Sequence, residues 1–310
     1  MVYYGDVHLY RIVQILKNSN IVFLCALFLG LIYPMPSAYL EDWIVFALIV
    51  VMIFSLTEVK FTKFSKISIK EIIITFFINY IFLSGLIIAL AYFLISDEQL
   101  YYGFIVMAAA PPAVAIIPFT KLLNGDLKLS LISNTSIYVL SIGLTPAILL
   151  LFAKTSDIDY SLAIITLLEL IVLPMIISRF ILENKYYLKV KKDINLVINI
   201  GFFIVIYTVI GLNQNILFTD LDILLMLSII GFLRTFVSGM FLYKLCNILK
   251  INPKKNISYT LFGSYKNLGL SATLALLLFS AKASIPSAVC IVMETGFFIL
   301  LSTYLKKYES

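Results

Sequence analysis

Apolar stretches long enough to cross a lipid bilayer follow one another along almost the whole chain. Of the 310 residues, 62% are hydrophobic and only 13% are charged. A soluble protein of this length could not bury so many apolar side chains. Inside a bilayer, backbone N–H and C=O groups must bond to one another, which favours helices. We therefore expect an all-α polytopic membrane protein.

Hydropathy predicts ten transmembrane helices. They cover residues 20–33, 38–56, 68–95, 100–122, 127–153, 160–181, 194–212, 221–246, 257–281 and 284–305. With both termini placed in the cytoplasm, Lys154 and Lys282 are the only basic residues on the outer side. The outer loops carry mainly acidic residues, namely Glu41, Asp42, Asp97, Glu98, Asp157, Asp159, Asp220 and Asp222. This asymmetry follows the positive-inside rule and predicts cytoplasmic termini, with the plasma membrane as the expected location.

The same topology accounts for the net charge of +6. The basic residues are scattered over short loops and both termini, so we expect no nucleic-acid partner. Cys25, Cys246 and Cys290 lie in apolar spans without a CxxC motif or a nearby histidine, and His8 stands alone. We therefore expect no metal site, no cofactor and no histidine-based catalytic triad.

Two of the spans are interrupted near their midpoints. Pro111-Pro112 interrupts the fourth span, and the segment from Gly263 to Asn267 interrupts the ninth. A helix break inside a bilayer is tolerated only where it is buried in protein or lines a wet cavity. Five spans in residues 1–153 and five in 154–310 form two repeats, and the odd number inverts the second relative to the first. Breaks at matching places of inverted repeats predict the central binding site of a transporter.

Four ionisable residues fall near the middle of spans, where each costs about 2.5 to 3.5 kcal/mol on insertion. They are Glu169, Arg234, Lys266 and Glu294. One interpretation is buried ion pairs that fix helix packing, which would involve Glu169 and Arg234. Lys266 lies at the second break, where it could neutralise an anionic substrate, carry a proton or permanently replace a bound cation. The alternative is a simple structural pair with Glu294.

Small polar residues and free backbone groups complete the candidate site. The candidate binding residues are Pro112, Ala113, Ser130, Asn134, Ser264, Tyr265, Lys266, Asn267 and Glu294, with Asn79 and Asn199 as further cavity candidates. The half-helix that starts near Ala113 would offer free N–H groups to an anion. Ser130 and Asn134, four residues apart, share one helix face. Alternatively, the prolines merely kink a helix, and the polar residues merely hold helices together.

The motifs at both breaks resemble those of the bile acid:sodium symporter family. The segment from Pro111 to Asp126, continued by Leu129-Ser130, resembles that family's proline, Thr-x-Leu, Gly-Asp and Leu-Ser pattern. The segment from Lys266 to Ser271 resembles its Gln-Asn crossover motif. The resemblance implies a core bundle of spans 3–5 and 8–10 beside a panel bundle of spans 1, 2, 6 and 7. It also implies broken helices that cross in the core and bind sodium there.

The sequence departs from this family at the sodium sites. The family's Ser-Asn pair after the first break falls on Ile116 and Ile117, its acidic residue on about Phe262, and its crossover Gln on Lys266. The first three side chains have no oxygen, and an ammonium group in a poorly solvated interior repels sodium. We therefore expect the usual sodium sites to be absent, and transport to be uncoupled or coupled to protons rather than sodium.

These features together predict a secondary active transporter of a small organic anion that works by alternating access, and no enzyme. The alternatives are a non-transporting ligand sensor or scaffold with a carrier fold, and a sodium-coupled symporter with altered sites. An intramembrane aspartyl protease does not fit. Asp126 lies in a loop, and no second mid-membrane aspartate is present to share a proton with it.

Overall fold

The computed structural model describes residues 14, 16–57, 69–153, 161, 165, 168–183, 187 and 191–309. Within these ranges every regular element is helical, as predicted. Six helices in this part of the chain are long and apolar enough to cross a membrane. They are Ser37–Thr57, Ile69–Leu94, Leu127–Phe152, Ile194–Leu212, Leu221–Ile248 and Ala281–Leu305.

The chain divides into two compact units. Unit 1 consists of Met1–Glu58 and Leu167–Ile216, and unit 2 of Val59–Thr166 and Leu217–Ser310. The helices of unit 1 are α2 (Ser19–Ile32), α3 (Ser37–Leu40), η1 (Glu41–Trp43), α4 (Ile44–Thr57), η4 (Leu168–Val172), α11 (Leu173–Glu183), η5 (Lys191–Asp193) and α13 (Ile194–Leu212). Helix α13 packs against α2 and α4, and α11 packs against α4. Helix α14 (Gln214–Thr219) lies on the chain where it passes from unit 1 to unit 2.

The described part of unit 2 contains four long helical runs and two broken spans. Its helices are α5 (Ile69–Phe76), η3 (Phe77–Leu83), α6 (Ser84–Leu94), α7 (Glu98–Ala109), α8 (Ile116–Leu122), α9 (Leu127–Phe152), α15 (Leu221–Phe232), η6 (Leu233–Val237), α16 (Ser238–Ile248), α17 (Pro253–Phe262), α18 (Leu268–Leu278) and α19 (Ala281–Glu309). The segments η3 and η6 are π-helical turns inside otherwise α-helical runs. Such turns are rare and often occur at functional sites.

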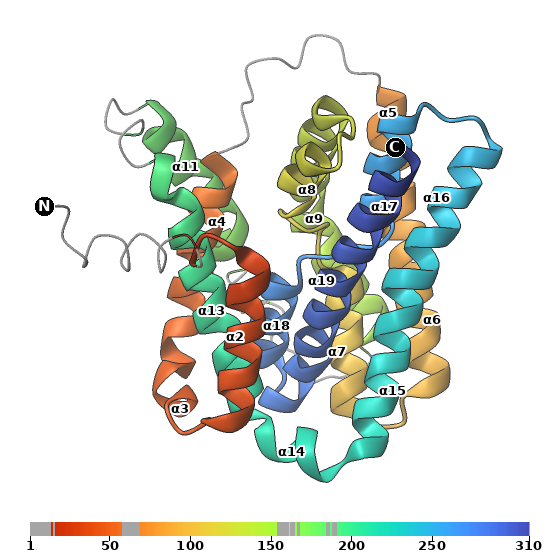
Figure 1. Ribbon diagram of the computed structural model, residues 1–310. Coiled ribbons are helices and arrows are strands. Elements are labelled where there is room, and N and C mark those ends of the chain that lie inside the picture. The colour runs from red at the N-terminus through yellow and green to blue at the C-terminus, as the bar shows by residue number, and fades with distance from the viewer. Residues whose placement is uncertain are drawn as a thin grey trace, which may run out of the picture. The chain divides into compact units, whose positions relative to one another are not determined.

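Each of the two broken spans has one half-helix at either end of unit 2. In Figure 1, α8 and α17 lie in the upper half of the unit, and α7 and α18 lie in the lower half. Both interruptions predicted from the sequence lie between these half-helices, at residues 110–115 and 263–267. Each of these two short non-helical connections thus joins a half-helix at one end of unit 2 to a half-helix at the other end.

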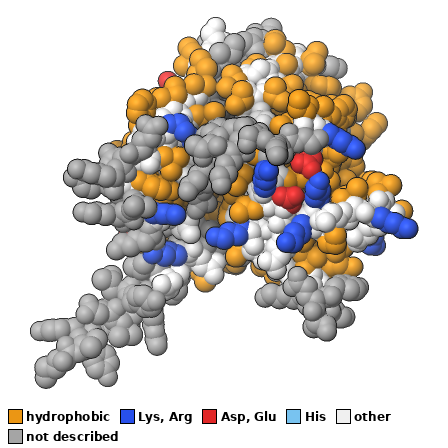
Figure 2. All heavy atoms as spheres, turned by 90° about the horizontal axis from the view of Figure 1, so that it is seen from above, with side chains coloured by type: hydrophobic (Ala, Val, Ile, Leu, Met, Phe, Trp, Pro, Cys, Tyr) orange, Lys and Arg blue, Asp and Glu red, His pale blue; other side chains and the backbone are white. Residues whose placement is uncertain are grey.

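Polar contacts hold the upper end of unit 2 together. Asn124 adopts a left-handed conformation with φ of 58°, which turns the chain between α8 and α9. The backbone N–H of Asp126 then donates to Lys254 O at 2.9 Å, and Lys255 pairs with Glu71. Figure 2 shows Lys and Arg side chains close to acidic ones on this face.

Candidate functional site

The first break begins where α7 ends at Ala109. Ala110 is extended, with φ of −62° and ψ of 149°, a conformation that a following proline favours. Pro111 and Pro112 have no backbone N–H, so they cannot continue the hydrogen-bond ladder of the helix. The last carbonyl groups of α7 therefore need other donors.

Those donors come from three other elements and from the second break. The bonds are Ser84 Oγ to Ala108 O at 2.7 Å, Thr145 Oγ1 to Ala109 O at 2.8 Å, Tyr80 OH to Ala109 O at 3.2 Å, Lys266 Nζ to Ala108 O at 3.1 Å, Lys266 Nζ to Ala110 O at 2.9 Å, and Asn267 N to Pro111 O at 2.8 Å. Each carbonyl from Ala108 to Pro111 thus has a donor. The C-terminal end of α7 is therefore buried, and these four carbonyls are all hydrogen-bonded.

The two non-helical connections contact each other directly. Pro112 and Lys266 form an isolated antiparallel β-bridge, and the bond from Asn267 N to Pro111 O lies beside it. Asn267 also caps α18, because its Oδ1 accepts from Leu270 N at 3.1 Å. These bonds fix the position of Lys266 where the two breaks meet.

The ammonium group of Lys266 is completely buried in a cage of oxygen atoms. Its Nζ donates to Asn79 Oδ1 at 2.9 Å and to the carbonyls of Ala108 and Ala110 at 3.1 and 2.9 Å. The ring of Tyr80 lies 4.3 Å from Nζ, in a cation–π arrangement. A lysine ammonium has three N–H donors, so all of them are used. The partial negative charges of the carbonyl oxygens at the end of α7 stabilise the positive charge of the ammonium group.

Asn79 connects this cage to the second break. Besides accepting from Lys266, it donates through Nδ2 to Phe262 O at 2.7 Å and to Tyr265 O at 3.2 Å. It lies in the π-helical turn η3 and is fully buried. One amide side chain therefore satisfies two carbonyls freed by the break and one bond of the ammonium.

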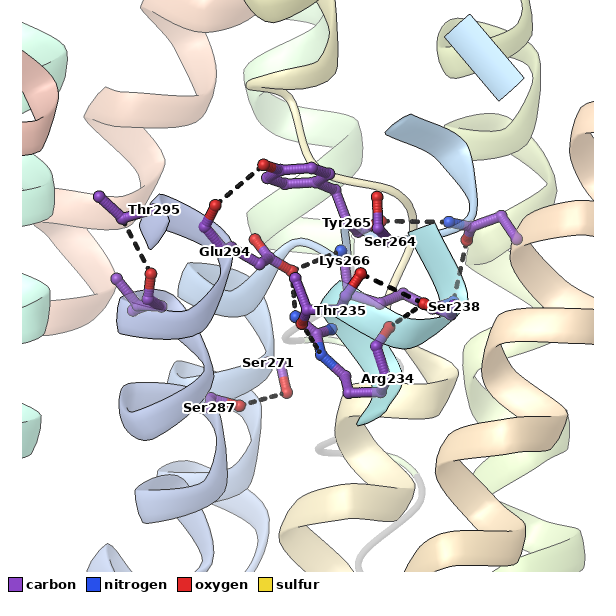
Figure 3. Close-up of polar contacts among 12 residues, drawn as sticks. Arg234, Thr235, Ser238, Ser264, Tyr265, Lys266, Ser271, Ser287, Glu294 and Thr295 are labelled. Carbon is purple, nitrogen blue, oxygen red and sulfur yellow. Dashed lines mark hydrogen bonds and ion pairs between the residues drawn. The ribbon is translucent and has the colours of Figure 1, made fainter. Parts of the chain in front are cut away.

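A second buried charge cluster lies on the other side of the Lys266 backbone. Figure 3 shows Glu294 of α19 between Arg234 of η6 and the backbone of Lys266. Glu294 Oε1 accepts from Arg234 Nη2 and also from Lys266 N at 3.0 Å. Tyr265 OH donates to Glu294 O at 2.9 Å. Glu294, paired with Arg234, thus accepts hydrogen bonds from two residues of the second break, Lys266 and Tyr265.

Two polar residues of α9 contact the half-helix α8 and the first break before it. Ser130 Oγ lies 2.8 Å from Thr120 Oγ1, and Asn134 Nδ2 donates to Ala113 O at 3.3 Å. Ser133 Oγ and Asn134 Oδ1 are buried without a hydrogen-bond partner among the described residues. The predicted Asn134 therefore lies beside the first break and Ser130 beside α8, and two buried oxygen atoms nearby on α9 have no partner among the described residues.

The structure shows the partners of the four mid-span charges, which the sequence left open. The carboxylate of Glu294 accepts from the backbone N–H of Lys266 and forms the buried ion pair of Arg234, while the Lys266 ammonium lies in the oxygen cage. Glu169, for which a buried ion pair was one interpretation, is exposed on η4 of unit 1. The sequence could not assign these partners, because hydropathy places a residue along a helix but not around it.

Three other sequence candidates have local structural roles. Ser264 Oγ donates to Thr260 O at 2.7 Å within the turn after α17. Asn199 belongs to unit 1, where it donates to Leu16 O at 2.8 Å. Ala113 contributes its carbonyl to Asn134.

The sequence reasoning missed two tyrosines of the site. Tyr80 covers the Lys266 ammonium, and Tyr138 OH accepts from Asn267 Nδ2 at 2.8 Å. The chain has 19 tyrosines, so residue type alone does not distinguish these two. Tyr80 directly follows Asn79, and the i to i+4 spacing from Asn134 to Tyr138 places that tyrosine on the polar face of α9. These adjacencies could have indicated both.

Comparison with known proteins identifies the family of the chain. The model of the SBF-like CPA transporter family matches residues 20–295 of the chain. A protein of Bacillus subtilis (strain 168), described as "Uncharacterized sodium-dependent transporter YocS", is 24% identical over 289 residues. The match covers 90% of this chain and 88% of that relative. Both findings support the resemblance to bile acid:sodium symporters that the two break motifs indicated.

Proposed function

The chain belongs to the SBF-like CPA transporter family and is an integral membrane protein, and from this premise we propose that it is a secondary transporter of a small organic anion. In this proposal the ammonium group of Lys266 permanently occupies the place of a coupling cation. The substrate reaches the crossing of the two breaks from alternate sides of the membrane.

The observation that carries this proposal is the oxygen cage around Lys266. An amide oxygen and two backbone carbonyls surround the ammonium at 2.9 to 3.1 Å. Backbone carbonyl oxygens are ligands that replace the hydration shell of a monovalent metal ion in channel filters. A site built from such groups but filled by a side chain of the same protein would be a cation site with a built-in cation.

The residues around the cage also disfavour a sodium ion nearby. Ile116, Ile117 and Phe262 are buried and offer no side-chain oxygen. A second monovalent cation close to the ammonium would be repelled strongly in a poorly solvated interior. The Bacillus subtilis relative carries a sodium-dependent description, so a sodium-coupled symporter with altered sites is the second candidate. The free oxygens Ser133 Oγ and Asn134 Oδ1 favour that candidate.

An anionic substrate is supported by the buried charges. The charged side chains buried within the described ranges are Arg234, Lys266 and Glu294, two cations against one carboxylate. An uncompensated buried charge is costly unless an opposite charge neutralises it. A bound organic anion would supply that charge.

The two units support a rocking mechanism. We propose ten spans in two inverted repeats, 1–153 and 154–310, with unit 2 as the core and unit 1 as the panel. The π-helical turns η3 and η6 lie in the third and eighth proposed spans, and the half-helix pairs form the fourth and ninth, as inverted repeats require. Exposed lysines at the end of unit 2 that holds α8 and α17 favour cytoplasmic termini in the plasma membrane.

A sodium titration of the purified protein tests the built-in cation. The unmodified protein should show no saturable rise in melting temperature with sodium chloride compared with choline chloride. Lys266→Gln, which empties the cage and leaves an amide oxygen, should gain one. The matched control Lys128→Gln removes an exposed lysine and should behave like the unmodified protein. Saturable sodium-dependent stabilisation of the unmodified protein would overturn the built-in cation.

Flux measurements in liposomes separate a carrier from a sensor. The reconstituted protein should exchange a labelled organic anion across the membrane, and Lys266→Ala should abolish exchange while it still inserts. Full exchange by Lys266→Ala would remove this residue from the mechanism. Binding without exchange in the unmodified protein would favour a sensor with a carrier fold.

A further inference from the structure

Arg234 lies where two helices of unit 2 approach each other unusually closely. A Cβ atom built on Gly231, one turn before Arg234, would lie 3.0 Å from Met293 Cγ and 3.3 Å from Cys290 Sγ of α19. Gly239, in the first turn of α16 directly after η6, lies against the ring of Phe297. Small residues on a helix face allow such close approach in membranes. The guanidinium group is thereby enclosed between the two helices.

The guanidinium group is only partly bonded. Its Nε donates to Thr235 Oγ1 at 2.9 Å, and its Nη2 pairs with Glu294. Its Nη1 is buried and has no acceptor among the described residues, although Arg234 is fully buried. Leaving a buried charged donor without an acceptor costs more than leaving a neutral one. Such a group in a native structure calls for a ligand or water that satisfies it.

In this structure neither of the other buried charges accepts a hydrogen bond from Arg234 Nη1. The Lys266 ammonium is itself only a donor, its three N–H groups are used in the oxygen cage, and the α7 carbonyls offset part of its charge. Glu294 Oε1 is shared between Arg234 Nη2 and the backbone N–H of Lys266. One positive charge is therefore left over, and its free donor is on Arg234. Lys266, the substrate contact expected from the sequence, has no donor left.

The cluster also borders the surface of unit 2. Arg234 itself has no exposed side-chain surface, whereas the side chain of Glu294 is 11% exposed. A small rearrangement of Glu294 would therefore open Arg234 to a ligand.

We propose that Arg234 Nη1 binds the carboxylate or sulfonate group of the transported anion. This inference rests on the proposed function, because it names the residue that recognises the cargo. A guanidinium group is suited to this role, since it stays charged and makes strong hydrogen bonds to oxyanions. Lys266 then holds the breaks together, and Arg234 receives the substrate.

The test is a titration of purified protein with choline acetate and choline methanesulfonate, read as melting temperature. A ligand that binds only the folded state raises the melting temperature saturably. The unmodified protein should show such a rise. Arg234→Lys keeps the positive charge but lacks the Nη1 donor. It should weaken binding of the anion about tenfold or more. Thr273→Val is the matched control, because it removes a buried hydroxyl that has no partner.

Each outcome decides the inference. An equal rise in the melting temperature of Arg234→Lys overturns the inference. So does the lack of a saturable rise in the melting temperature of the unmodified protein. Should Arg234→Lys not fold, Glu294→Gln decides. Removing the competing carboxylate charge should tighten anion binding, and unchanged or weaker binding overturns the inference.

The salts used here contain no sodium, so this result is independent of the sodium titration. If the unmodified protein shows no sodium response and Arg234→Lys binds the anion as well as the unmodified protein does, only the role of Arg234 is refuted. A saturable sodium response of the unmodified protein would refute only the built-in cation.

Discussion

Asn79 makes three buried hydrogen bonds that no other side chain can replace at the same place. It accepts from Lys266 Nζ and donates to two carbonyls of the second break. Asn79→Leu would leave those groups buried without partners, at about 1 to 3 kcal/mol each. We expect a loss of about 3 kcal/mol or more in the free energy of unfolding, measured by denaturation in detergent. Thr273→Val should lose less than about 1 kcal/mol, because its hydroxyl has no partner. Equal losses in the two variants would contradict the bridging role of Asn79.

The residue types at the breaks could be predicted, but their pairing could not. Pro111-Pro112 and the turn before Asn267 indicated both interruptions, because these residues disrupt helical hydrogen bonding. Lys266 was expected at the second break and lies there. Its acceptors include the carbonyls of Ala108 and Ala110, which are backbone atoms that no residue type marks. The partners of Glu294 and Glu169 could not be assigned, because the direction of a side chain depends on how its helix is rotated.

At the scale of the element, Asn267 is the point where α18 begins and where the two breaks are tied. Its Oδ1 caps α18, and its Nδ2 donates to Tyr138 OH. Asn267→Ala removes both bonds and should lower the free energy of unfolding by about 1 to 2 kcal/mol from the cap alone. Asn267→Ser keeps an uncharged capping oxygen and should lose less. Thermal unfolding of the two variants side by side checks this, and an Asn267→Ala protein as stable as Asn267→Ser would contradict it.

The long helices were predictable because bilayer thickness sets their length. Predicted spans 127–153 and 194–212 correspond to Leu127–Phe152 and Ile194–Leu212. Capping side chains mark several starts, such as Asp126 before α9. The π-helical turns η3 and η6 were not predicted, because an extra residue in one helical turn leaves no mark in hydropathy. The turn η3 contains Asn79 and the turn η6 contains Arg234, and both side chains point toward the second break. Part of predicted span 160–181 lies outside the described residues.

At the scale of the whole molecule, ion pairs at loop ends should make stability depend on pH. Burial alone would raise the pKa of Asp97, but its hydrogen bond from Lys282 at 2.6 Å and the bond from Leu100 N hold the pKa below its ordinary value of 3.8. The ionised carboxylate therefore stabilises the fold above that ordinary value, and the contribution is lost as the pH falls through the lower folded value. Asp97→Asn can still cap α7 but loses the charge.

We expect Asp97→Asn to be less stable than the unmodified protein at neutral pH and equally stable at a pH below the folded pKa. The difference should be small and should shrink in high salt, because the pair is partly exposed. Melting temperatures measured across this pH range check the prediction. A difference that grows with acidification would contradict it.

The proposed built-in cation, the ammonium group fixed among the carbonyls at the end of α7, would have an energetic consequence for the cell. In an uncoupled carrier of this kind the counter-charge stays in the protein, so a monovalent anion would cross the membrane without an accompanying ion. Each turnover would then move one negative charge through the electrical potential, worth about 2.3 kcal/mol per 100 mV. Across a membrane whose cytoplasmic side is negative, that voltage would push the anion outward. Such a carrier would be driven by voltage and would expel its cargo unless the external concentration were far higher.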